Sequence, residues 1–352
     1  MANNDAPMQV EGRLFGVMPD DFVPLQNEDE IESKKKCCAC SAKFIVCVVI
    51  GVILILIALT GLWLWVSYLT ISVTPCTHPD ALLPDRVPPN MEDKVLVNPS
   101  LFGSPVAQGL AWDGTSLFFS GTDFVASTVK EGKAYKIVES VDPAIPPMLS
   151  DQDYWHVGDI TFFDNTLLLP IQDHDLSKPR VLLVDPSTLL SISSALVPGM
   201  KSFPWAAVRQ DAGQPAVLYS SEYMNANEIT RHEYPFVNAN EITRHEYPSM
   251  TEMPSIPLPE TVKGAQGGEF DAAGILHLSA DKPDAHGCNM YEVDVSDSEH
   301  PLRAAYTLAS LLGPAGFMEV EGLVFTDAAL LVSYNLWYFL KGIITIAPPP
   351  SP

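Results

Sequence analysis

The sequence predicts an all-β protein, a β-propeller of five or six blades, preceded by one transmembrane helix. Three observations lead to this prediction. An uncharged apolar stretch near the N-terminus is long enough to cross a bilayer. After it, a pattern of two short strands recurs about every 50 residues, and helical periodicity is nearly absent. With 352 residues, 47% of them apolar, the chain can build a substantial core.

The charge balance limits the classes of partner. The formal net charge is -23, and a phosphate backbone is bound through basic surfaces. The sequence therefore predicts no nucleic-acid role and favours cationic or neutral partners. The simplest interpretation of the acidity is a solvated surface that keeps the protein soluble.

Residues 44–71 form the predicted membrane span. They read FIVCVVIGVILILIALTGLWLWVSYLTI and contain no charged residue. The segment is longer than the about 20 apolar residues that a helix needs to cross a bilayer. A cleavable signal peptide has a shorter apolar region close to the N-terminus, so this segment is expected to remain as a signal anchor in the lipid bilayer.

The orientation follows from the flanking residues. The N-terminal side carries four lysines, Lys34, Lys35, Lys36 and Lys43, whereas the twenty residues after Ile71 carry only Arg86. By the positive-inside rule the N-terminus is cytosolic. Trp63, Trp65 and Tyr68 are then expected in the outer interfacial belt. The prediction is a type II, single-pass protein of the secretory-pathway membrane or cell surface, with a lumenal or extracellular C-terminal domain.

The cysteines divide along the same boundary. Cys37, Cys38 and Cys40 stand beside lysines just before the span, a setting typical of S-palmitoylation. Zinc binding is the alternative, but no His or fourth thiol follows at metal spacing. Cys76 and Cys288 are the two thiols on the oxidising side, so a disulfide between them is one hypothesis.

The remaining domain boundaries come from composition. Residues 1–43 show no strand or helix period and are predicted to be a disordered cytosolic tail. Residues 72–92 are Pro-rich and are predicted to be an extended stalk. The propeller is assigned to residues 93–347, and residues 348–352 form a Pro-rich C-terminal tail.

Four copies of one pattern define the blades. They are QGLAWDGTSLFFS (108–120), GDITFFDNTLLLP (158–170), QGGEFDAAGILHLS (266–279) and EGLVFTDAALLVS (321–333), and a fifth unit is placed at residues 204–223. Each copy is an apolar strand, a tight turn and a second apolar strand. We interpret each as the inner hairpin of one blade. A β-sandwich is the competing architecture, but it predicts no repeat at this spacing.

The other strands complete the blades. Third strands are predicted in PRVLLVDPSTL (179–189) and CNMYEVDVSDS (288–298), and fourth strands at 189–197 and 303–311. Residues 93–103 are expected to close the ring by pairing with IITI near the C-terminus.

A tandem duplication interrupts the third unit. NANEITRHEYP occurs at 225–235 and again at 238–248. Because the 13-residue period is odd, one continuous strand would swap its faces, so one copy is expected to loop out. A metal site built from the doubled His and Glu residues is an alternative.

The candidate site is the ring of positions where the innermost strands begin. These positions hold Gln108, His156, Asp159, Trp205, Gln266, Glu269, Glu319 and Glu321. Such positions line the central channel of a propeller. His156 and Asp159 are close enough to act as a base and its orienter, or to form a structural pair. The acidic members instead suit a calcium ion, which prefers several oxygen ligands.

The tail, signal anchor and lumenal propeller resemble the layout of the strictosidine synthase-like membrane proteins, the group that includes adipocyte plasma membrane-associated protein. These belong to the wider paraoxonase and gluconolactonase superfamily. There a Glu, together with Asn and Asp residues, holds calcium in the channel. The resemblance implies Glu321 and Asp159 as calcium ligands, although no Asn stands at the matching strand starts.

Three functional hypotheses remain at this stage. The first is an anchored propeller that binds or scaffolds an unidentified protein or small-molecule partner. The second is a calcium-dependent hydrolase of esters or lactones that uses His156 as a base. The third is a receptor that signals through its cytosolic tail. Whether the protein is an enzyme is left open, and motifs of other enzyme classes are absent from the sequence.

Overall fold

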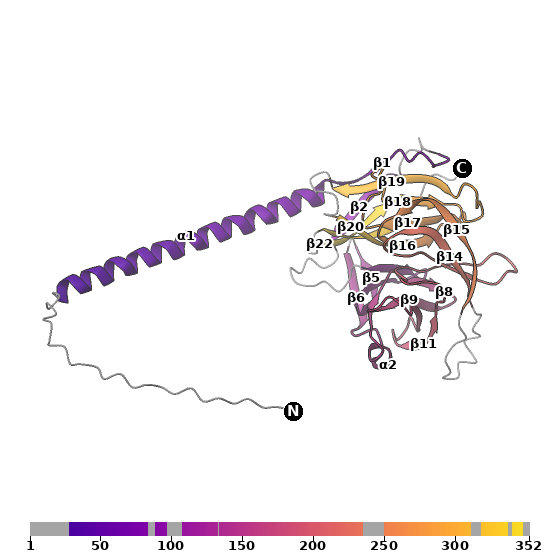
Figure 1. Ribbon diagram of the computed structural model, residues 1–352, viewed down its shortest axis with the longest axis horizontal. Helices are drawn as coiled ribbons and strands as arrows, with labels where there is room; N and C mark the ends of the chain where they lie inside the picture. Colours follow the sequence, from indigo (N-terminus) through magenta and orange to yellow (C-terminus); the bar gives the residue numbers. More distant parts are fainter. Residues whose placement is uncertain are drawn as a thin grey trace, which may run out of the picture. The chain divides into compact units, whose positions relative to one another are not determined.

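The computed structural model describes residues 28–83, 89–96, 108–132, 134–234, 250–310, 318–336 and 340–347. The chain forms two compact units, residues 1–61 and 62–352. The second unit contains five antiparallel sheets of four or five strands and is a five-bladed β-propeller (Figure 1). The predicted fold class is confirmed, and the propeller has five blades rather than six.

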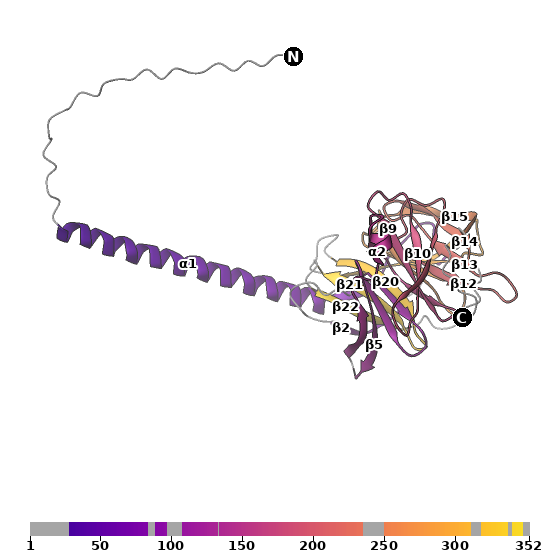
Figure 2. The same ribbon diagram turned by 90° about the horizontal axis from the view of Figure 1, so that it is seen from below.

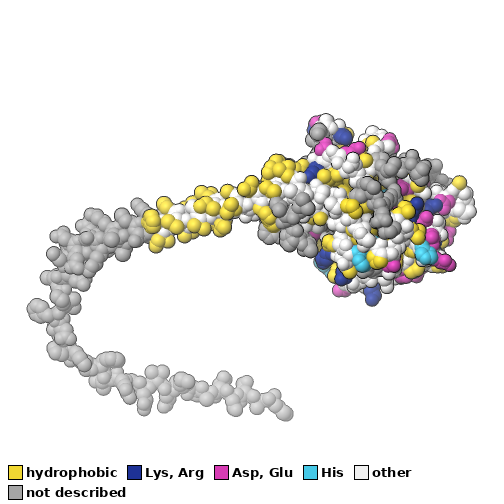
Figure 3. Space-filling view, turned by 90° about the horizontal axis from the view of Figure 1, so that it is seen from above, with side chains coloured by type: hydrophobic (Ala, Val, Ile, Leu, Met, Phe, Trp, Pro, Cys, Tyr) yellow, Lys and Arg dark blue, Asp and Glu magenta, His cyan; other side chains and the backbone are white. Residues whose placement is uncertain are grey.

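Helix α1 covers Glu28–Leu69. Its Phe44–Leu69 part is long and apolar enough to cross a membrane, and apolar side chains cover this part of its surface (Figure 3). The helix starts inside the segment predicted to be a disordered tail, where Glu30 and Glu32 precede Lys34 and Lys36 by four residues, a helix-favouring spacing. Cys37, Cys38 and Cys40 fall within α1, and their acylation remains a prediction.

Blades one and two follow the predicted order. Blade one consists of β3 (Gly109–Trp112), β4 (Leu117–Gly121), β5 (Phe124–Glu131) and β6 (Ala134–Val141). Helix α2 (Pro147–Ser150) leads to blade two, which consists of β7 (Tyr154–Val157), β8 (Thr161–Phe163), β9 (Thr166–Asp173), β10 (Arg180–Val184) and β11 (Ser191–Leu196). Both β7 and β8 pair with β9, so the inner strand of this blade is broken between them.

Blade three holds the duplication. It consists of β12 (Ala207–Arg209), β13 (Val217–Ser220), β14 (Ala226–Glu233) and β15 (Thr251–Val262), and it lies beside blade two (Figure 2). The first copy of the duplicated segment forms β14 and pairs on both sides. The second copy falls outside the described residues, so the predicted looping out is untested.

Blades four and five contain the two strands that follow α1. Blade four consists of β16 (Ala265–Phe270), β17 (Leu276–Ala280), β18 (Met290–Val293) and β19 (Leu302–Ser310), with β1 (Ile71–Pro75) added at its edge. Blade five consists of β20 (Met318–Phe325), β21 (Leu330–Leu336), β22 (Leu340–Ile346) and β2 (Met91–Leu96). β2 pairs with β22, and Lys94 stands opposite Ile344, so the predicted ring closure is correct.

The segment predicted to be a stalk is partly structured. β1 pairs with β19 from Ile71 to Pro75, and Cys76 is joined to Cys288 by a disulfide with a Cα–Cα distance of 5.7 Å. The disulfide hypothesis is therefore confirmed. It ties this segment to blade four over a sequence separation of 212 residues.

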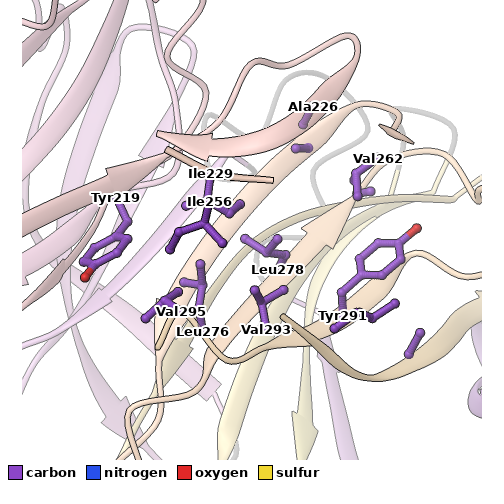
Figure 4. Close-up of a cluster of buried hydrophobic side chains, with 14 of the residues drawn as sticks. Tyr219, Ala226, Ile229, Ile256, Val262, Leu276, Leu278, Tyr291, Val293 and Val295 are labelled. Atoms are coloured by element: carbon purple, nitrogen blue, oxygen red, sulfur yellow. The ribbon is translucent and has the colours of Figure 1, made fainter. Parts of the chain in front are cut away.

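The core lies between neighbouring blades. Figure 4 shows one such layer, in which Tyr219, Ile229 and Ile256 of blade three face Leu276 and Leu278 of blade four. Burying one aliphatic side chain of this size stabilises a fold by about 1.5–3 kcal/mol. Packing of each blade against the next therefore explains why every inner hairpin is apolar on both of its faces.

The turns and the last serine of the repeat have clear physical roles. Asp164 and Asn165, with φ of 47° and 56°, take the left-handed conformation that a two-residue hairpin turn needs. Ser120 Oγ donates to Gly158 O at 2.8 Å, and Ser333 Oγ donates to Gly322 O at 3.1 Å. Each serine thus binds a backbone carbonyl beside the axis.

Candidate functional site

A carboxyl group occupies the centre of the propeller. At the second position of the repeated pattern, three blades carry Gly109, Gly267 and Gly322, whereas blade two carries Asp159. A Cβ on Gly322 would lie 2.1 Å from Asp159 Oδ1, and a Cβ on Gly109 would lie 2.5 Å from Asp159 Cα. Glycine is required at positions 109 and 322 because the backbone and side chain of Asp159 leave no room for a Cβ where the blades meet.

Three other blades bind this carboxyl group through their backbones. Oδ1 accepts from the N–H of Leu110 at 2.9 Å. Oδ2 accepts from the N–H of Gly268 at 3.2 Å and of Leu323 at 3.4 Å. The backbone of Asp159 also forms a bridge with Trp205 of blade three. One residue therefore connects all five blades, and both of its carboxyl oxygens are occupied.

The proposed base lies apart from this network. His156 is in β7, and its Nδ1 is buried without a hydrogen-bond partner among the described residues. Burial lowers the pKa of His156 to about 4. Burial also raises the pKa of Asp159 well above its usual value, although its N–H donors oppose this. No hydrogen bond joins His156 to Asp159 in the described part, so their acid–base pairing remains a prediction.

Trp205, predicted to line the channel, is packed inside the fold. It is 0% exposed, and its Nε1 donates to Ser221 Oγ at 2.9 Å. A Cβ on Gly268 would lie 2.3 Å from the Trp205 ring. In this structure the indole fills the space between blades three and four and has no face exposed to a ligand.

The acidic ring residues lie at two levels. We call the side on which the innermost strands begin the mouth face. Glu319 and Glu321 precede Gly322 on β20 and lie toward the mouth face, whereas Glu269 follows Gly268 on β16 and lies beyond Asp159. Thr161 Oγ1 donates to Glu269 at 3.2 Å, and burial raises the pKa of Glu269 to about 7.

The two glutamines of the ring are half-buried, and both lie on the mouth side. The N–H of Gln108 donates to Ser120 O at 3.0 Å. Gln266 lies on β16 directly before Gly267. Neither side chain has a described hydrogen bond, so their role in binding remains a prediction.

Five residues gather at the mouth face of blades three to five. This mouth cluster consists of Tyr223, Asp281, Glu319, Glu321 and Asn335. Asn335 Nδ2 donates to Glu321 Oε1 at 2.8 Å and lies 3.5 Å from Glu319 Oε2. Tyr223 OH donates to Asp281 Oδ2 at 2.8 Å. Of the five, only Glu319 and Glu321 were predicted.

Three oxygens of the mouth cluster lack a hydrogen-bond donor within the described ranges. Glu321 Oε2, Asn335 Oδ1 and Asp281 Oδ1 are buried without a hydrogen-bond partner in the described part of the chain. Burial, followed by repulsion from Glu319, raises the pKa of Glu321 well above its usual value. Burial also raises the pKa of Asp281. The cluster is therefore rich in acceptors, and the nearby Lys341 ammonium on β22 offsets part of the rise in the pKa of Glu321.

The sequence contained a signal for the missed residues. A polar side chain, Thr122, Gln172, Asp281 or Asn335, stands two positions after the last residue of each of the four repeat copies, and Glu222 stands two positions after Ser220, the last residue of β13. These positions end the second strands at the mouth face. The prediction considered only strand starts, and so it overlooked the neighbouring strand ends.

The fit to calcium is partial. Calcium prefers carboxylate and amide oxygens, which Glu321 and Asn335 offer, but both oxygens of Asp159 already accept backbone N–H groups. Among the described residues no group of three or more His, Cys, Asp or Glu could hold a metal ion. Calcium binding by Asp159 and Glu321 together remains a prediction, and the donor set favours Glu321.

Comparisons with known proteins reach the fold only. No protein-family model matches the chain, and no curated protein matches it. A hypothetical protein from Leishmania major is 15% identical, with a TM-score of 0.42, over 74% of this chain and 91% of that one. A gluconolactonase from Xanthomonas campestris is 11% identical, with a TM-score of 0.40, over 78% and 95%. A GH43_1 enzyme from Xanthomonas citri is 13% identical, with a TM-score of 0.45, over 73% and 90%.

The chain is thus a five-bladed β-propeller with an N-terminal helix able to span a membrane. The predicted resemblance to strictosidine synthase-like membrane proteins is supported at the level of architecture, and membership of that family stays a prediction.

Proposed function

We propose that the protein is a single-pass type II membrane protein whose outward-facing propeller binds a ligand at the mouth cluster. The N-terminal lysines and the apolar span support the orientation, with a cytosolic N-terminus. The partner is a protein or a small molecule, and binding rather than catalysis is the leading function. Acylation of Cys37, Cys38 and Cys40 would strengthen the attachment at the cytosolic surface.

The three unpaired oxygens of the mouth cluster carry this proposal. A buried acceptor without a donor costs about 1–3 kcal/mol, so a ligand that supplies donors recovers that free energy. Carboxylate and amide oxygens accept hydrogen bonds, and a carboxylate is in addition neutralised by a cation. The cluster therefore favours a ligand with a positive charge and several N–H groups, such as an alkylammonium.

The test uses the full chain in phosphatidylcholine nanodiscs, with n-butylammonium as the probe and sodium chloride at equal ionic strength as the reference. A ligand that binds only the folded state stabilises it by about 2.7 kcal/mol at 100 times its Kd. We expect a saturable rise in Tm that Glu321→Gln abolishes and that Glu139→Gln, on the exposed side of β6, retains. The absence of a saturable rise would reject the proposal.

The alternative function is a calcium-dependent hydrolase of small esters or lactones in the same channel. The neighbouring oxygens of Glu321 and Asn335 favour it, because calcium prefers such ligands. His156 favours it as well, because its lowered pKa keeps the imidazole neutral near pH 7 and therefore able to accept a proton. After chelation, a calcium titration should raise Tm, and the rise should be lost in Glu321→Gln or Asp159→Asn. A flat response to calcium would exclude this alternative.

A further inference from the structure

The last turns of α1 belong to the propeller unit. Within residues 62–352, Leu64 and Ser67 are buried against blades four and five. Ser310 Oγ donates to Ser67 O at 2.9 Å, and Tyr68 OH donates to Lys94 O at 3.0 Å. β1 begins at Ile71, so no flexible spacer separates the end of the apolar helix from the first propeller strand.

A lysine fixes this helix end. Lys94 Nζ donates to the carbonyl oxygens of Tyr68, Leu69 and Ile71 at 3.0, 2.9 and 3.1 Å. The last carbonyls of a helix have no partner within the helix and carry partial negative charge. The ammonium group of Lys94 on β2 satisfies those of Tyr68 and Leu69, and this ties the helix end within residues 62–69 to blade five.

The attachment point lies on the mouth-face side. Ser310 is the last residue of β19, and β19 ends at the mouth face because β16, three antiparallel strands earlier, begins there. Lys94 stands near the end of β2, beside the start of β22. Residues 62–69, the part of α1 that belongs to the propeller unit, therefore end on the same side as the mouth cluster.

Exposed apolar side chains continue on this face, away from the helix. Met148 in α2, Trp155 in β7, Leu176 after β9 and Met224 after β13 are 70%, 42%, 42% and 55% exposed. All four lie in or next to connections on the mouth face of blades one to three. These four residues and the helix end at blades four and five therefore lie on the same side of the propeller.

From this placement we infer that the mouth face docks on the outer leaflet of the bilayer that α1 crosses. Met148, Trp155, Leu176 and Met224 then lie in the headgroup layer, where amphipathic and apolar side chains are stable. Because the mouth cluster is acidic, a zwitterionic phospholipid surface fits it and an anionic one does not. This inference rests on the membrane anchoring in the proposed function, and it makes membrane-partitioned amphiphiles the ligand class.

The test measures how close each side of the propeller lies to lipid. The full chain, with serine in place of Cys37, Cys38, Cys40 and Cys47, is placed in phosphatidylcholine nanodiscs that contain lipid with a nitroxide on its headgroup. A fluorophore is attached in Met148→Cys or Met224→Cys. The matched control is Leu190→Cys, which is 60% exposed in the turn between β10 and β11 on the opposite face.

We expect the nitroxide lipid to quench the labels at positions 148 and 224 at least threefold more strongly than the label at 190. Equal quenching in protein that purifies with the nanodisc would overturn the docking and leave the anchor intact. Failure of the chain to purify with the nanodisc would overturn both. A Tm within 2 °C of wild type is required of each labelled variant, so that a loss of quenching cannot come from unfolding.

Discussion

Removal of the Asp159 carboxyl group should destabilise the whole propeller. Asp159→Ala leaves three buried N–H groups, those of Leu110, Gly268 and Leu323, without an acceptor. Each unsatisfied buried donor costs about 1–3 kcal/mol. Two of the three bonds, at 3.2 and 3.4 Å, lie at or beyond the usual length, so the lower part of that range applies to them. The expected loss is about 3–6 kcal/mol.

This loss is a large part of the stability of a typical domain, about 5–15 kcal/mol. For a domain of this size it corresponds to a fall in Tm of very roughly 6–24 °C. Asp159→Asn keeps one carbonyl oxygen and removes a charge whose burial is unfavourable, so its cost should be about half or less. It also keeps the experiment measurable if Asp159→Ala fails to fold.

The assay is urea denaturation of the full chain in nanodiscs, followed by near-ultraviolet circular dichroism. The matched control is Asp113→Ala, because Asp113 Oδ1 accepts two N–H groups at 2.7 and 2.6 Å in an exposed turn. Water replaces those bonds, so the control should cost about 1 kcal/mol or less. Equal losses for Asp159→Ala and Asp113→Ala, or a stable Asp159→Ala, would refute the reasoning.

Three further predictions concern other parts of the fold. The raised pKa of Glu269, about 7 against 4.5 for the free group, should by itself make wild type lose about 3 kcal/mol of stability as pH rises from 4.5 to 7, because the folded state holds the proton longer. In urea titrations Glu269→Gln should reduce the slope of stability against pH by that amount, and an unchanged slope would contradict this prediction. Lys94→Met should lower Tm because three carbonyl oxygens lose their donor. The control Lys136→Met removes only an exposed ion pair with Glu131 and should change Tm little. Equal changes in Tm for the two variants would show that Lys94 is dispensable. Deletion of residues 236–248 shortens the connection between β14 and β15 from 17 residues to 4. It should stabilise the fold by about 1 kcal/mol, because closing a shorter loop costs less conformational entropy. A lower Tm would show that the second copy contributes contacts.

The fold was largely predictable because its signals are local. The hairpin turn at Asp164 and Asn165 and the repeated apolar pairs mark each blade independently of the others. The closing pair of β2 and β22 was also predictable, since a ring of repeats needs its two ends to join. The start of α1 at Glu28 was not predicted from the sequence, because the low hydrophobicity of residues 1–43 suggested a disordered tail.

The candidate site was predictable only in part. Repeat alignment placed Asp159 and Glu321 beside the channel, but it could not show that Asp159 accepts N–H groups from three other blades. It also missed Asn335 and Asp281, which come from strand ends rather than strand starts. Trp205 was predicted from its place at a strand start, and in the structure its indole is fully buried between blades three and four.

The sequence by itself determined the apolar span, the repeated hairpins and the two cysteines able to pair, because each depends on residue type and spacing along the chain. Only the tertiary structure decided which polar groups are satisfied. The Asp159 carboxyl group and the Glu321 carboxyl group look alike in sequence, yet backbone donors bind both oxygens of the first, whereas one oxygen of the second has no donor among the described residues. That difference arises where five blades converge, because the donors that meet the two Asp159 oxygens come from residues 49, 109 and 164 positions away along the chain.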